Sequence, residues 1–367
     1  MCKRLYKMME AFAETGHEVH YVALEELPIK SEKIKAHLLR SPFKKEKSLA
    51  FWMFFALKGA ASILSIARRQ GIQLITVFGS FYSLISVPAS VVMGIPLITF
   101  IRADATEIDK ILGRPAFARF MQDAAAFLSL RLSSKVIAVS ETLKKRLILK
   151  YRLKGAEVLP NNIEENVAGN GKRENRRSAA RSEMGAKETT FIISTSGVLD
   201  RRKNIGFLLK SFSLVKNQGA LLVIVGDGPA ASTLEDMAIT LGLKDRIIFT
   251  GWREDATHIV RGSDLFVFPS LHEGASNSIL EALGAEVPVM ASNIEENREI
   301  LKYEELLFKQ GDIEGLAKKI ELCIHDKTFY GMIRELSLKR GREMKFDWKD
   351  RVRKICGLRL ENERRPT

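Results

Sequence analysis

The sequence predicts an α/β protein made of two Rossmann-like, doubly wound parallel-sheet domains that face a cleft. In both halves, short apolar runs alternate with helical segments, as in parallel sheets covered by helices. At 367 residues the chain is long enough for two domains of ordinary size. Between the halves, NVAGNGKRENRR has the composition of a linker, which places a domain boundary near residues 164–175.

The first half contains a segment, residues 71–101, with no Asp, Glu, Lys or Arg, which is long enough to span a bilayer. Its prolines Pro88 and Pro96 and its serines instead favour a strand, a helix and a buried strand. In order, we expect a helix ending near Gly16, a strand at 17–24, a helix at 49–67, a strand at 72–78, a helix at 82–93, and then strands at 96–101 and 135–139 before a helix at 141–151.

The second half repeats the alternation. We expect strands at 191–195, 221–225, 247–251, 264–268 and 288–291, helices beginning at 205, ending near 241, passing through 259 and at 277–283, a helix capped by Asp312, and an amphipathic helix at 344–360. The expected domains are residues 1–165 and 166–345, followed by a C-terminal segment, residues 346–367, that is expected to be helical.

The charge and the cysteine content limit which partners and which compartment are expected. The net charge is +14, and residues 1–150 hold 23 Lys or Arg against 12 Asp or Glu. This balance suggests an anionic membrane surface, a phosphorylated lipid or nucleic acid, although a generally basic surface explains it equally well. No basic motif with interleaved aromatics is present, so nucleic acid is not expected. Three scattered cysteines indicate a reducing compartment and no structural metal.

The chain is organised around FVFPSLHEGASNSILEALGAEVPVMAS, residues 266–292. A strand, a small-residue loop and a helix start in this order let backbone N–H groups and the helix dipole meet a phosphate. Glu273 and Glu281 flank the helix start and can face one pocket. The alternative is structural: Ser278 to Glu281 fits a capping box, and Gly284 fits a helix C-cap.

Three other loops follow strand ends, where open α/β sheets bind ligands. SGVLDRRKN, residues 196–204, is a natural diphosphate clamp, or else a solvated charged turn. Gly226-Asp227-Gly228-Pro229 is a weaker signal, because a Gly-x-Gly turn alone has little specificity. In IRADATEI, residues 101–108, Arg102 could hold a phosphate or form a surface ion pair with Asp104.

These motifs together resemble the signature of the family 4 retaining glycosyltransferases, or group 1 glycosyl transferases, which have the GT-B fold. The matching residues are Asp264, Pro269, Ser270, Glu273, Gly274, Glu281, Ala282, Gly284, Pro288 and Val289. So many matches in register make a specific signal. The resemblance covers nearly the whole chain, strongly for residues 190–326 and loosely for 1–165. It implies that residues 1–165 form the acceptor-side domain and 166–345 the domain that binds the donor, and that the helix in residues 346–367 crosses back to the first domain.

The resemblance implies roles for individual residues. Glu273 contacts the transferred sugar, Glu281 the donor ribose, and Lys203 the phosphates; Val198 stands where the family commonly has an Arg, so Arg201 or Arg202 has to substitute. The catalytic residues are then Glu273, Lys203 and Arg202. The residues expected to bind the donor are Gly197, Arg201, Gly226, Gly228, Gly274, Ala275, Ser276, Asn277, Ser278 and Glu281. Arg102 and Asp104 are expected on the acceptor side.

The function implied is transfer of a hexosyl group, with retention, from a nucleotide-diphosphate sugar to a glycan or lipid-linked acceptor in cell-surface polysaccharide or glycolipid synthesis. The donor is a co-substrate, and no further cofactor or metal is expected, since the chain has no Asp-x-Asp pair. The alternative is a non-catalytic nucleotide-sugar-binding or partner subunit. An epimerase or phosphorylase fits the fold but not the Glu273 and Glu281 pattern.

Two expectations concern the N-terminal part. Family members have a first strand and a glycine-rich loop before the helix on which this sequence opens, so we expect the DNA upstream of Met1 to encode them. Lys44, Lys45 and Lys47 precede an aromatic cluster at 51–55, which is either a packed helix or a membrane-docking patch. We therefore expect a cytoplasmic protein that lies peripherally on the inner face of the membrane, without a spanning helix.

Overall fold

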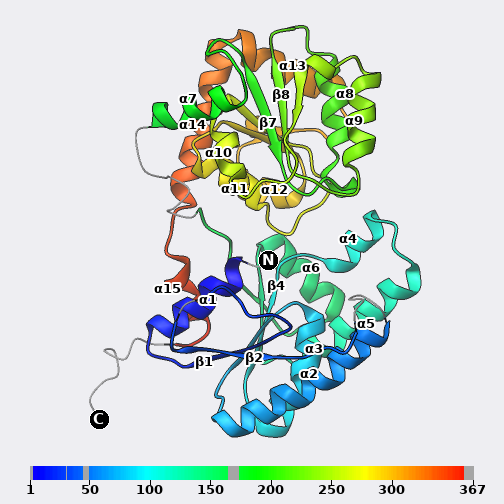
Figure 1. Ribbon diagram of the computed structural model, residues 1–367, viewed down its shortest axis with the longest axis vertical. Helices are drawn as coiled ribbons and strands as arrows, with labels where there is room; N and C mark the ends of the chain where they lie inside the picture. The colour runs from blue at the N-terminus through cyan, green and yellow to red at the C-terminus, as the bar shows by residue number, and fades with distance from the viewer. Residues whose placement is uncertain (1–2, 30, 44–48, 164–172, 359–367) are drawn as a thin grey trace. The chain divides into compact units, whose positions relative to one another are not determined.

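The computed structural model describes residues 3–29, 31–43, 49–163 and 173–358 (Figure 1). The chain divides into two compact units, and their ranges are 1–106, 115–160 and 347–367 for the first, and 107–114 and 161–346 for the second. Most of the linker expected near residues 164–175 lies outside the described residues.

The first unit contains parallel β-structure. Strands β3 (Ile75–Phe78), β4 (Leu97–Ile101), β5 (Lys135–Ala138) and β6 (Glu157–Val158) form one sheet in this order, and β1 (Val19–Ala23) pairs with β2 (Ile34–Leu38) in a separate sheet. The uncharged segment 71–101 contributes β3, β4 and the helix between them, so it folds as the sequence predicts. β4 is buried along its whole length, which explains its apolar composition.

The helices of the first unit are α1 (Lys3–Glu14), α2 (Leu49–Gln70), α3 (Ser80–Met93), α5 (Ala116–Leu132), α6 (Glu141–Tyr151) and α15 (Trp348–Ile355); α4 (Ala105–Ile111) lies at the division between the units. α3 packs against both α2 and α5. α15 packs on α1, where Arg353 Nε donates to the Ala11 carbonyl at 3.0 Å. The C-terminal helix thus belongs to the first unit.

The aromatic cluster at the start of α2 is packed within the unit. Phe51 is buried, and Trp52 and Phe55 make edge contacts with Phe81 and Tyr82. Lys44, Lys45 and Lys47, which were expected to flank the cluster as a docking patch, lie outside the described residues. Among the described helices, the segment Phe51–Gln70 of α2 is long and apolar enough to cross a membrane by length and composition alone.

The second unit contains one parallel sheet of six described strands, of which five were expected and β12 was not. The strand order is β12 (Leu307–Phe308), β11 (Val289–Ser292), β10 (Leu265–Phe268), β7 (Ile192–Ser196), β8 (Leu221–Val225) and β9 (Ile247–Phe249). The central strands β7 and β10 are buried at every position. Their carboxyl ends carry the two motif loops into the same region of the unit.

The helices of the second unit are α7 (Arg173–Glu183), η2 (Arg201–Lys203), α8 (Ile205–Ser213), α9 (Ala231–Thr240), η3 (Lys244–Arg246), α10 (Ala256–Arg261), α11 (Asn277–Gly284), α12 (Glu295–Leu301), η4 (Glu304–Leu306), α13 (Ile313–His325) and α14 (Lys327–Glu343). The Asp312 carboxylate accepts from Gly315 N–H at 2.8 Å, which confirms it as the cap of α13.

One expectation about the linker is wrong. Residues 173–177 have linker composition but form the start of α7. The physical reason is tertiary: Arg177 pairs with Asp264 at 2.5 Å, and the buried Arg181 bonds both Asp264 and the Gly262 carbonyl. These charge-assisted bonds hold α7 against the sheet. The polar composition of α7 alone does not predict a helix there. Asp264, part of the matched signature, therefore has a structural role.

Candidate active site

The loop after β7 turns a lysine inward. Gly197 has φ +146°, and the Asp200 carboxylate accepts from Lys203 N–H at 3.2 Å, which caps the short helix η2. Asn204, with φ 54°, then leads into α8. As a result Lys203 is buried, whereas Arg201 and Val198 are exposed. The loop is therefore not the solvated charged turn that was the alternative, because its Lys203 side chain is buried.

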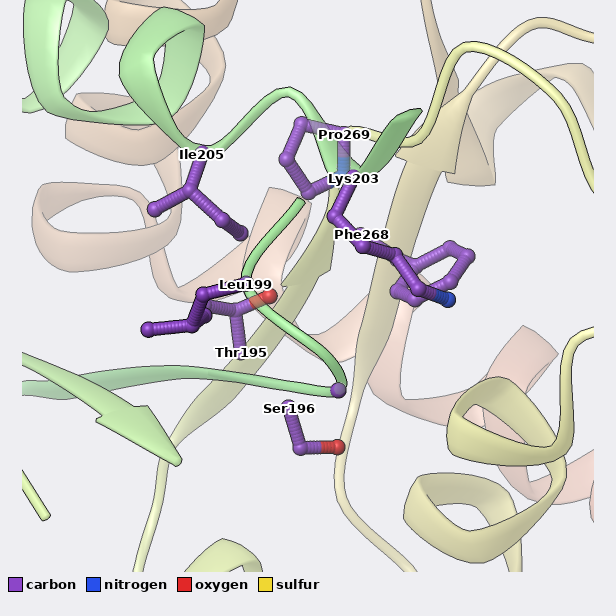
Figure 2. Close-up of a pocket in the computed structure, with 8 residues that line it drawn as sticks. Thr195, Ser196, Leu199, Lys203, Ile205, Phe268 and Pro269 are labelled. Atoms are coloured by element: carbon purple, nitrogen blue, oxygen red, sulfur yellow. The ribbon is translucent and has the colours of Figure 1, made fainter. Parts of the chain in front are cut away.

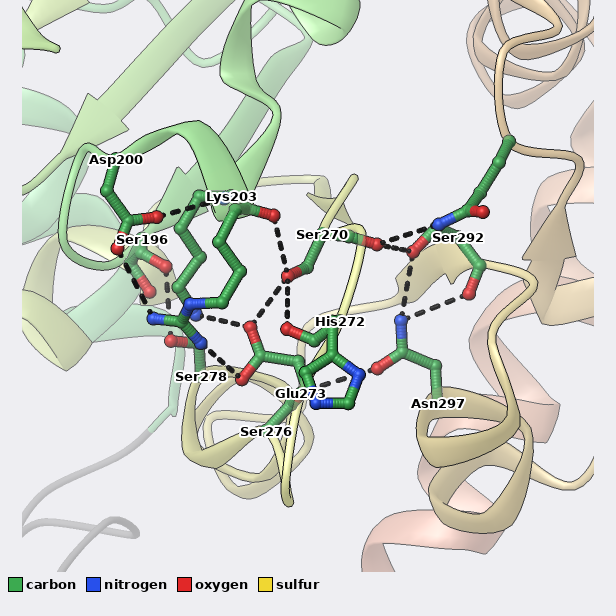
Figure 3. Close-up of polar contacts among 12 residues, drawn as sticks. Ser196, Asp200, Lys203, Ser270, His272, Glu273, Ser276, Ser278, Ser292 and Asn297 are labelled. Atoms are coloured by element: carbon green, nitrogen blue, oxygen red, sulfur yellow. Dashed lines mark hydrogen bonds and ion pairs between the residues drawn. The ribbon is translucent and has the colours of Figure 1, made fainter. Parts of the chain in front are cut away.

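The Glu273 carboxylate is the centre of the site. Lys203 Nζ lies 2.7 Å from Oε1, Ser270 Oγ donates to the same oxygen at 2.7 Å, and Arg202 Nη1 lies 3.2 Å from Oε2. Figure 3 shows the Lys203 and Ser270 side chains converging on Glu273. Glu273 and Lys203 are 6% and 8% exposed, so each charge depends on its partner. The two cations come from η2 and the carboxylate from the loop before α11, all within the second unit.

A small hollow lies beside Lys203 (Figure 2). The Lys203 ammonium lies 4.5 Å from the centre of the Phe268 ring, a cation–π contact that fixes the lysine side chain. The hollow is lined by Thr195, Ser196, Gly197, Leu199, Lys203, Ile205, Phe268 and Pro269. The buried Thr195 Oγ1 has no hydrogen-bond partner among the described residues, so a donor remains at the edge of the hollow.

The two glycines of the Gly226-Asp227-Gly228 turn have a packing role. A Cβ on Gly226 would lie 1.9 Å from the Gly197 carbonyl oxygen, and one on Gly228 would lie 2.6 Å from the Leu199 carbonyl oxygen. Leu199 N–H donates to the Asp227 carbonyl at 2.9 Å, which holds the two loops together. Glycine is thus required for the backbone of one loop to approach the other. Contact of these glycines with a donor stays a prediction.

The start of α11 does not form the capping box that was the alternative for this motif. Ser276 is the N-cap, but its Oγ donates to Asn297 Oδ1 at 3.1 Å, and no side chain caps the helix. Ser278 Oγ donates to the Ser196 carbonyl at 3.1 Å. Gly284 is the last residue of the helix rather than a left-handed C-cap. The first N–H groups of α11 are therefore not bonded by a capping side chain.

The remaining residues expected at the donor site have these positions. Gly274 is buried and Ala275 half-buried in the loop before α11, and the Asn277 side chain accepts from Asn161 Nδ2 at 2.8 Å. Glu281 is half-buried on α11, one turn after Asn277. In the first unit, Asp104 accepts from Lys150 Nζ at 3.3 Å, and Arg102 follows β4. Their contact with an acceptor stays a prediction.

Residues that sequence reasoning missed support the loop that carries Glu273. Asn297 Nδ2 donates to the Ser292 carbonyl at 3.0 Å, and Ser292 Oγ donates to the Ser270 carbonyl (Figure 3). His272 Nδ1 lies 3.2 Å from the buried Glu296 carboxylate. Glu296 and Asn297 lie in NIEENREIL, the segment after β11, and both side chains are buried, which the polar local sequence does not indicate. These contacts fix the position of the loop that carries Glu273.

In the described ranges, no group of three or more His, Cys, Asp or Glu side chains has the geometry of a metal site. The charged groups of the site are two cations, Lys203 and Arg202, and two carboxylates, Glu273 and Asp200. This arrangement can bind a diphosphate through its cations while the carboxylate accepts hydrogen bonds from a sugar.

Two family models match the chain, one in each half. The model described as Glycosyl transferases group 1 matches residues 176–340, and the model described as Glycosyltransferase Family 4 matches residues 3–166. Among curated proteins, the lipopolysaccharide core biosynthesis glycosyltransferase LpsD of Rhizobium meliloti (strain 1021) is 34% identical over 143 residues, 38% of this chain and 41% of that protein. The match thus spans about two fifths of that relative's length.

A second relative is the UDP-Gal:alpha-D-GlcNAc-diphosphoundecaprenol alpha-1,3-galactosyltransferase of Escherichia coli, 32% identical over 152 residues, 40% of this chain and 39% of that protein. Among solved structures, Anabaena Alr3699/HepE in complex with UDP has a TM-score of 0.75 at 16% identity, over 96% of this chain and 95% of that chain. WaaG, a glycosyltransferase involved in lipopolysaccharide biosynthesis, has a TM-score of 0.74 at 15% identity, over 96% and 94%.

The two units with their parallel sheets have the fold of the GT-B glycosyltransferases. The chain belongs to the family 4, or group 1, glycosyltransferases, since the two family models together match nearly all of it. The fold class and the family that the sequence predicted are thereby confirmed.

Proposed function

We propose that this protein transfers a hexosyl group, with retention of configuration, from a nucleotide-diphosphate sugar to a glycan or a lipid-linked acceptor. The observation that carries the proposal is the buried contact of Lys203 and Arg202 with Glu273, beside a helix start without a capping side chain. The Anabaena protein Alr3699/HepE has been solved in complex with UDP, with UDP and glucose, and with UDP-glucose, which supports a nucleotide-sugar donor.

The site residues have distinct roles in this proposal. Lys203 and Arg202 bind the donor diphosphate and stabilise the charge that develops on it as the glycosidic bond breaks. The N–H groups at the start of α11 contact the same oxygens. Glu273 orients the transferred sugar through its hydroxyls, and Glu281 binds the ribose. The two cations supply the electrophilic stabilisation, so the reaction needs no bound metal.

The acceptor side and the cellular location complete the proposal. Two of the relatives have names that place them in lipopolysaccharide core synthesis or on a diphosphoundecaprenol acceptor, which supports cell-surface polysaccharide or glycolipid synthesis. Arg102 and Asp104, after β4, are proposed to contact this acceptor. A lipid-linked acceptor also favours a cytoplasmic protein held peripherally at the inner face of the membrane.

The experiment is a transfer assay with purified protein, a panel of nucleotide sugars, and a lipid extract of the source cells. We expect the release of one nucleoside diphosphate. We also expect the new glycosidic linkage to have the same anomeric configuration as the donor, which NMR of the product measures. Inversion of the anomeric centre would contradict retention. Donor binding without transfer to any acceptor would instead support the alternative of a non-catalytic subunit, which the intact constellation around Glu273 does not favour.

A further inference from the structure

Helix α5 packs on α3 by one face and exposes an apolar face on its other side (Figure 1). The buried residues are Ala126, Ser129 and Leu130. At about 100° per residue, the exposed residues span an arc of about 140° opposite them, with Ala124 near its centre. They are 43–74% exposed, and they are Phe117, Phe120, Met121, Phe127, Leu128 and Leu132. An apolar face about 23 Å long marks an interaction surface rather than chance exposure.

The charges next to this face are balanced. Residues 104–132 hold four Lys or Arg and four Asp or Glu. The ion pairs around the helix have N···O distances of 2.9–3.3 Å, and they join Lys110 to Glu107, Arg114 to Asp109, and Lys150 to both Asp104 and Asp123. An anionic surface would gain little here, because these cations are already paired with acids. A rim of paired charges around an apolar centre is instead the composition of a protein–protein interface.

The side chains of the exposed face fit a second copy of the same helix. Ala124, a small exposed residue, lies at the middle of the face. Large residues stand three and four positions to each side of it, and they are Phe120, Met121, Phe127 and Leu128. Where two such helices cross antiparallel on a twofold axis at Ala124, a residue n positions after it meets the residue n positions before it on the partner. The bulky groups then pack on either side of a close approach at the small residue.

The charge on the exposed face favours the antiparallel pairing. Arg131 is the one charged residue of α5 within the exposed arc, seven positions after Ala124. Its guanidinium lies 5.1 Å from the centre of the Phe127 ring in the same helix. In the antiparallel pairing Arg131 meets Phe117 of the partner subunit, a second aromatic ring for a cation–π contact. A parallel pairing would place the two Arg131 side chains next to each other, and their like charges would repel.

The exposed area is sufficient for a stable dimer. Taking about 200 Å² for a fully exposed residue of this size, the six residues expose on the order of 650 Å² on each copy. Two copies would bury about 1,300 Å² in total, within the range of about 1,200–2,000 Å² for stable interfaces. We infer that the protein forms a homodimer in which two α5 helices pair antiparallel through this face. The inference concerns assembly and does not rest on the proposed function.

The first test is sedimentation velocity of the full-length protein at about 1–100 µM, where an interface of this size should associate. The variant Phe117→Ser/Phe120→Ser removes four phenylalanines from the contact, because each substitution acts in both copies. We expect a dimeric wild type and a dissociation constant at least about 100-fold higher for the variant. The matched control Leu214→Ser/Ile239→Ser changes two exposed residues of the second unit and should sediment like the wild type. Thermal unfolding should agree for all three proteins, since the substituted side chains are exposed.

The second test locates the twofold axis by disulfide cross-linking. Ala124→Cys is made in a background in which Cys2 and Cys356 are replaced by Ser, while the buried Cys323 is kept. We expect a disulfide-linked dimer on mild oxidation, because the axis brings the two Cα atoms within the roughly 4–7 Å that a disulfide requires. Ile239→Cys in the same background is the control, since this exposed position lies in the second unit. It should remain monomeric on a non-reducing gel.

The outcomes distinguish the possible occupants of this face. A wild type that is monomeric at about 100 µM, or a dimer that persists in Phe117→Ser/Phe120→Ser, overturns the inference. Equal cross-linking of Ala124→Cys and Ile239→Cys overturns it as well. If the wild type is monomeric and binds vesicles of phosphatidylcholine and phosphatidylglycerol through the two phenylalanines, the face contacts lipid and the inference is wrong. Failure to bind any nucleotide sugar contradicts the proposed function and leaves the dimer unaffected.

Discussion

The Lys203 ammonium lies 2.7 Å from the Glu273 carboxylate, and both side chains are buried. A buried ion pair of this kind is stable only with further hydrogen bonds, which Ser270 and Arg202 supply. The pair therefore places a cation and a carboxylate at fixed positions next to the start of α11. We regard this contact as the structural basis of donor binding.

Replacing Glu273 by Gln tests the role of the carboxylate. The amide keeps the shape of the side chain but loses the charge that holds Lys203 and Arg202. We expect kcat to fall by about two to three orders of magnitude, the range seen when one preorganised electrostatic contact is removed, with a smaller change in KM. Steady-state kinetics measure this. Glu314→Gln, on the exposed first turn of α13, is the control and should behave like the wild type.

Gly228→Ala tests the contact between the two loops. The added Cβ would lie 2.6 Å from a backbone oxygen of Leu199, so one loop must move. Overpacking of this kind destabilises a protein by about 1–3 kcal/mol. Urea unfolding measures the change. Gly331→Ala in α14 meets nothing within 4 Å and should be neutral or stabilise the helix by up to about 1 kcal/mol. Equal stability of the two variants would show that the loops are not tightly packed.

The stability of the first unit should fall in mild acid because of a histidine pair across β1 and β2. His20 Nδ1 lies 2.8 Å from His37 Nε2, with Glu18 and Lys35 beside them. Burial, and then the positive charges of His20 and Lys35, lower the pKa of His37. The folded state thus favours the neutral ring, so its contribution is complete above the ordinary pKa of about 6.5 and is lost as the pH falls below it.

The measurement for the histidine pair is urea unfolding at pH 7.5 and 5.5. His37→Gln should narrow the difference in unfolding free energy between the two pH values, because the glutamine does not titrate. His325→Gln, an exposed position of α13, serves as the control and should leave the difference unchanged. A His37→Gln variant with the full pH dependence of the wild type would assign that dependence to other groups.

The sequence predicted the sheets well because their strands are short apolar runs between turn residues. β7, β10 and α11 lie within one or two residues of the expected positions. The start of α7 was missed because the bonds of Arg177 and Arg181 to Asp264 are tertiary, between residues more than 80 positions apart. Local composition carries no information about such contacts.

At the site, the sequence identified Lys203 and Glu273 but not the contact between them, which depends on the turn that Gly197 and Asp200 form. It left open whether Arg201 or Arg202 faces inward, since adjacent residues in a loop have no periodicity to distinguish them. Helix α5 was not among the elements expected from the sequence.

The measurement that tests the central claim most directly is calorimetric titration of a panel of nucleotide sugars into the wild type, Lys203→Ala and Glu281→Gln. We predict that the wild type binds one donor and that Lys203→Ala loses about 1.5–3 kcal/mol of binding free energy, the contribution of a hydrogen bond to a charged group. Glu281→Gln should also bind more weakly. Lys210→Ala, an exposed residue of α8, should match the wild type. Equal affinity of the wild type and both site variants for the donor would contradict the assignment of this site.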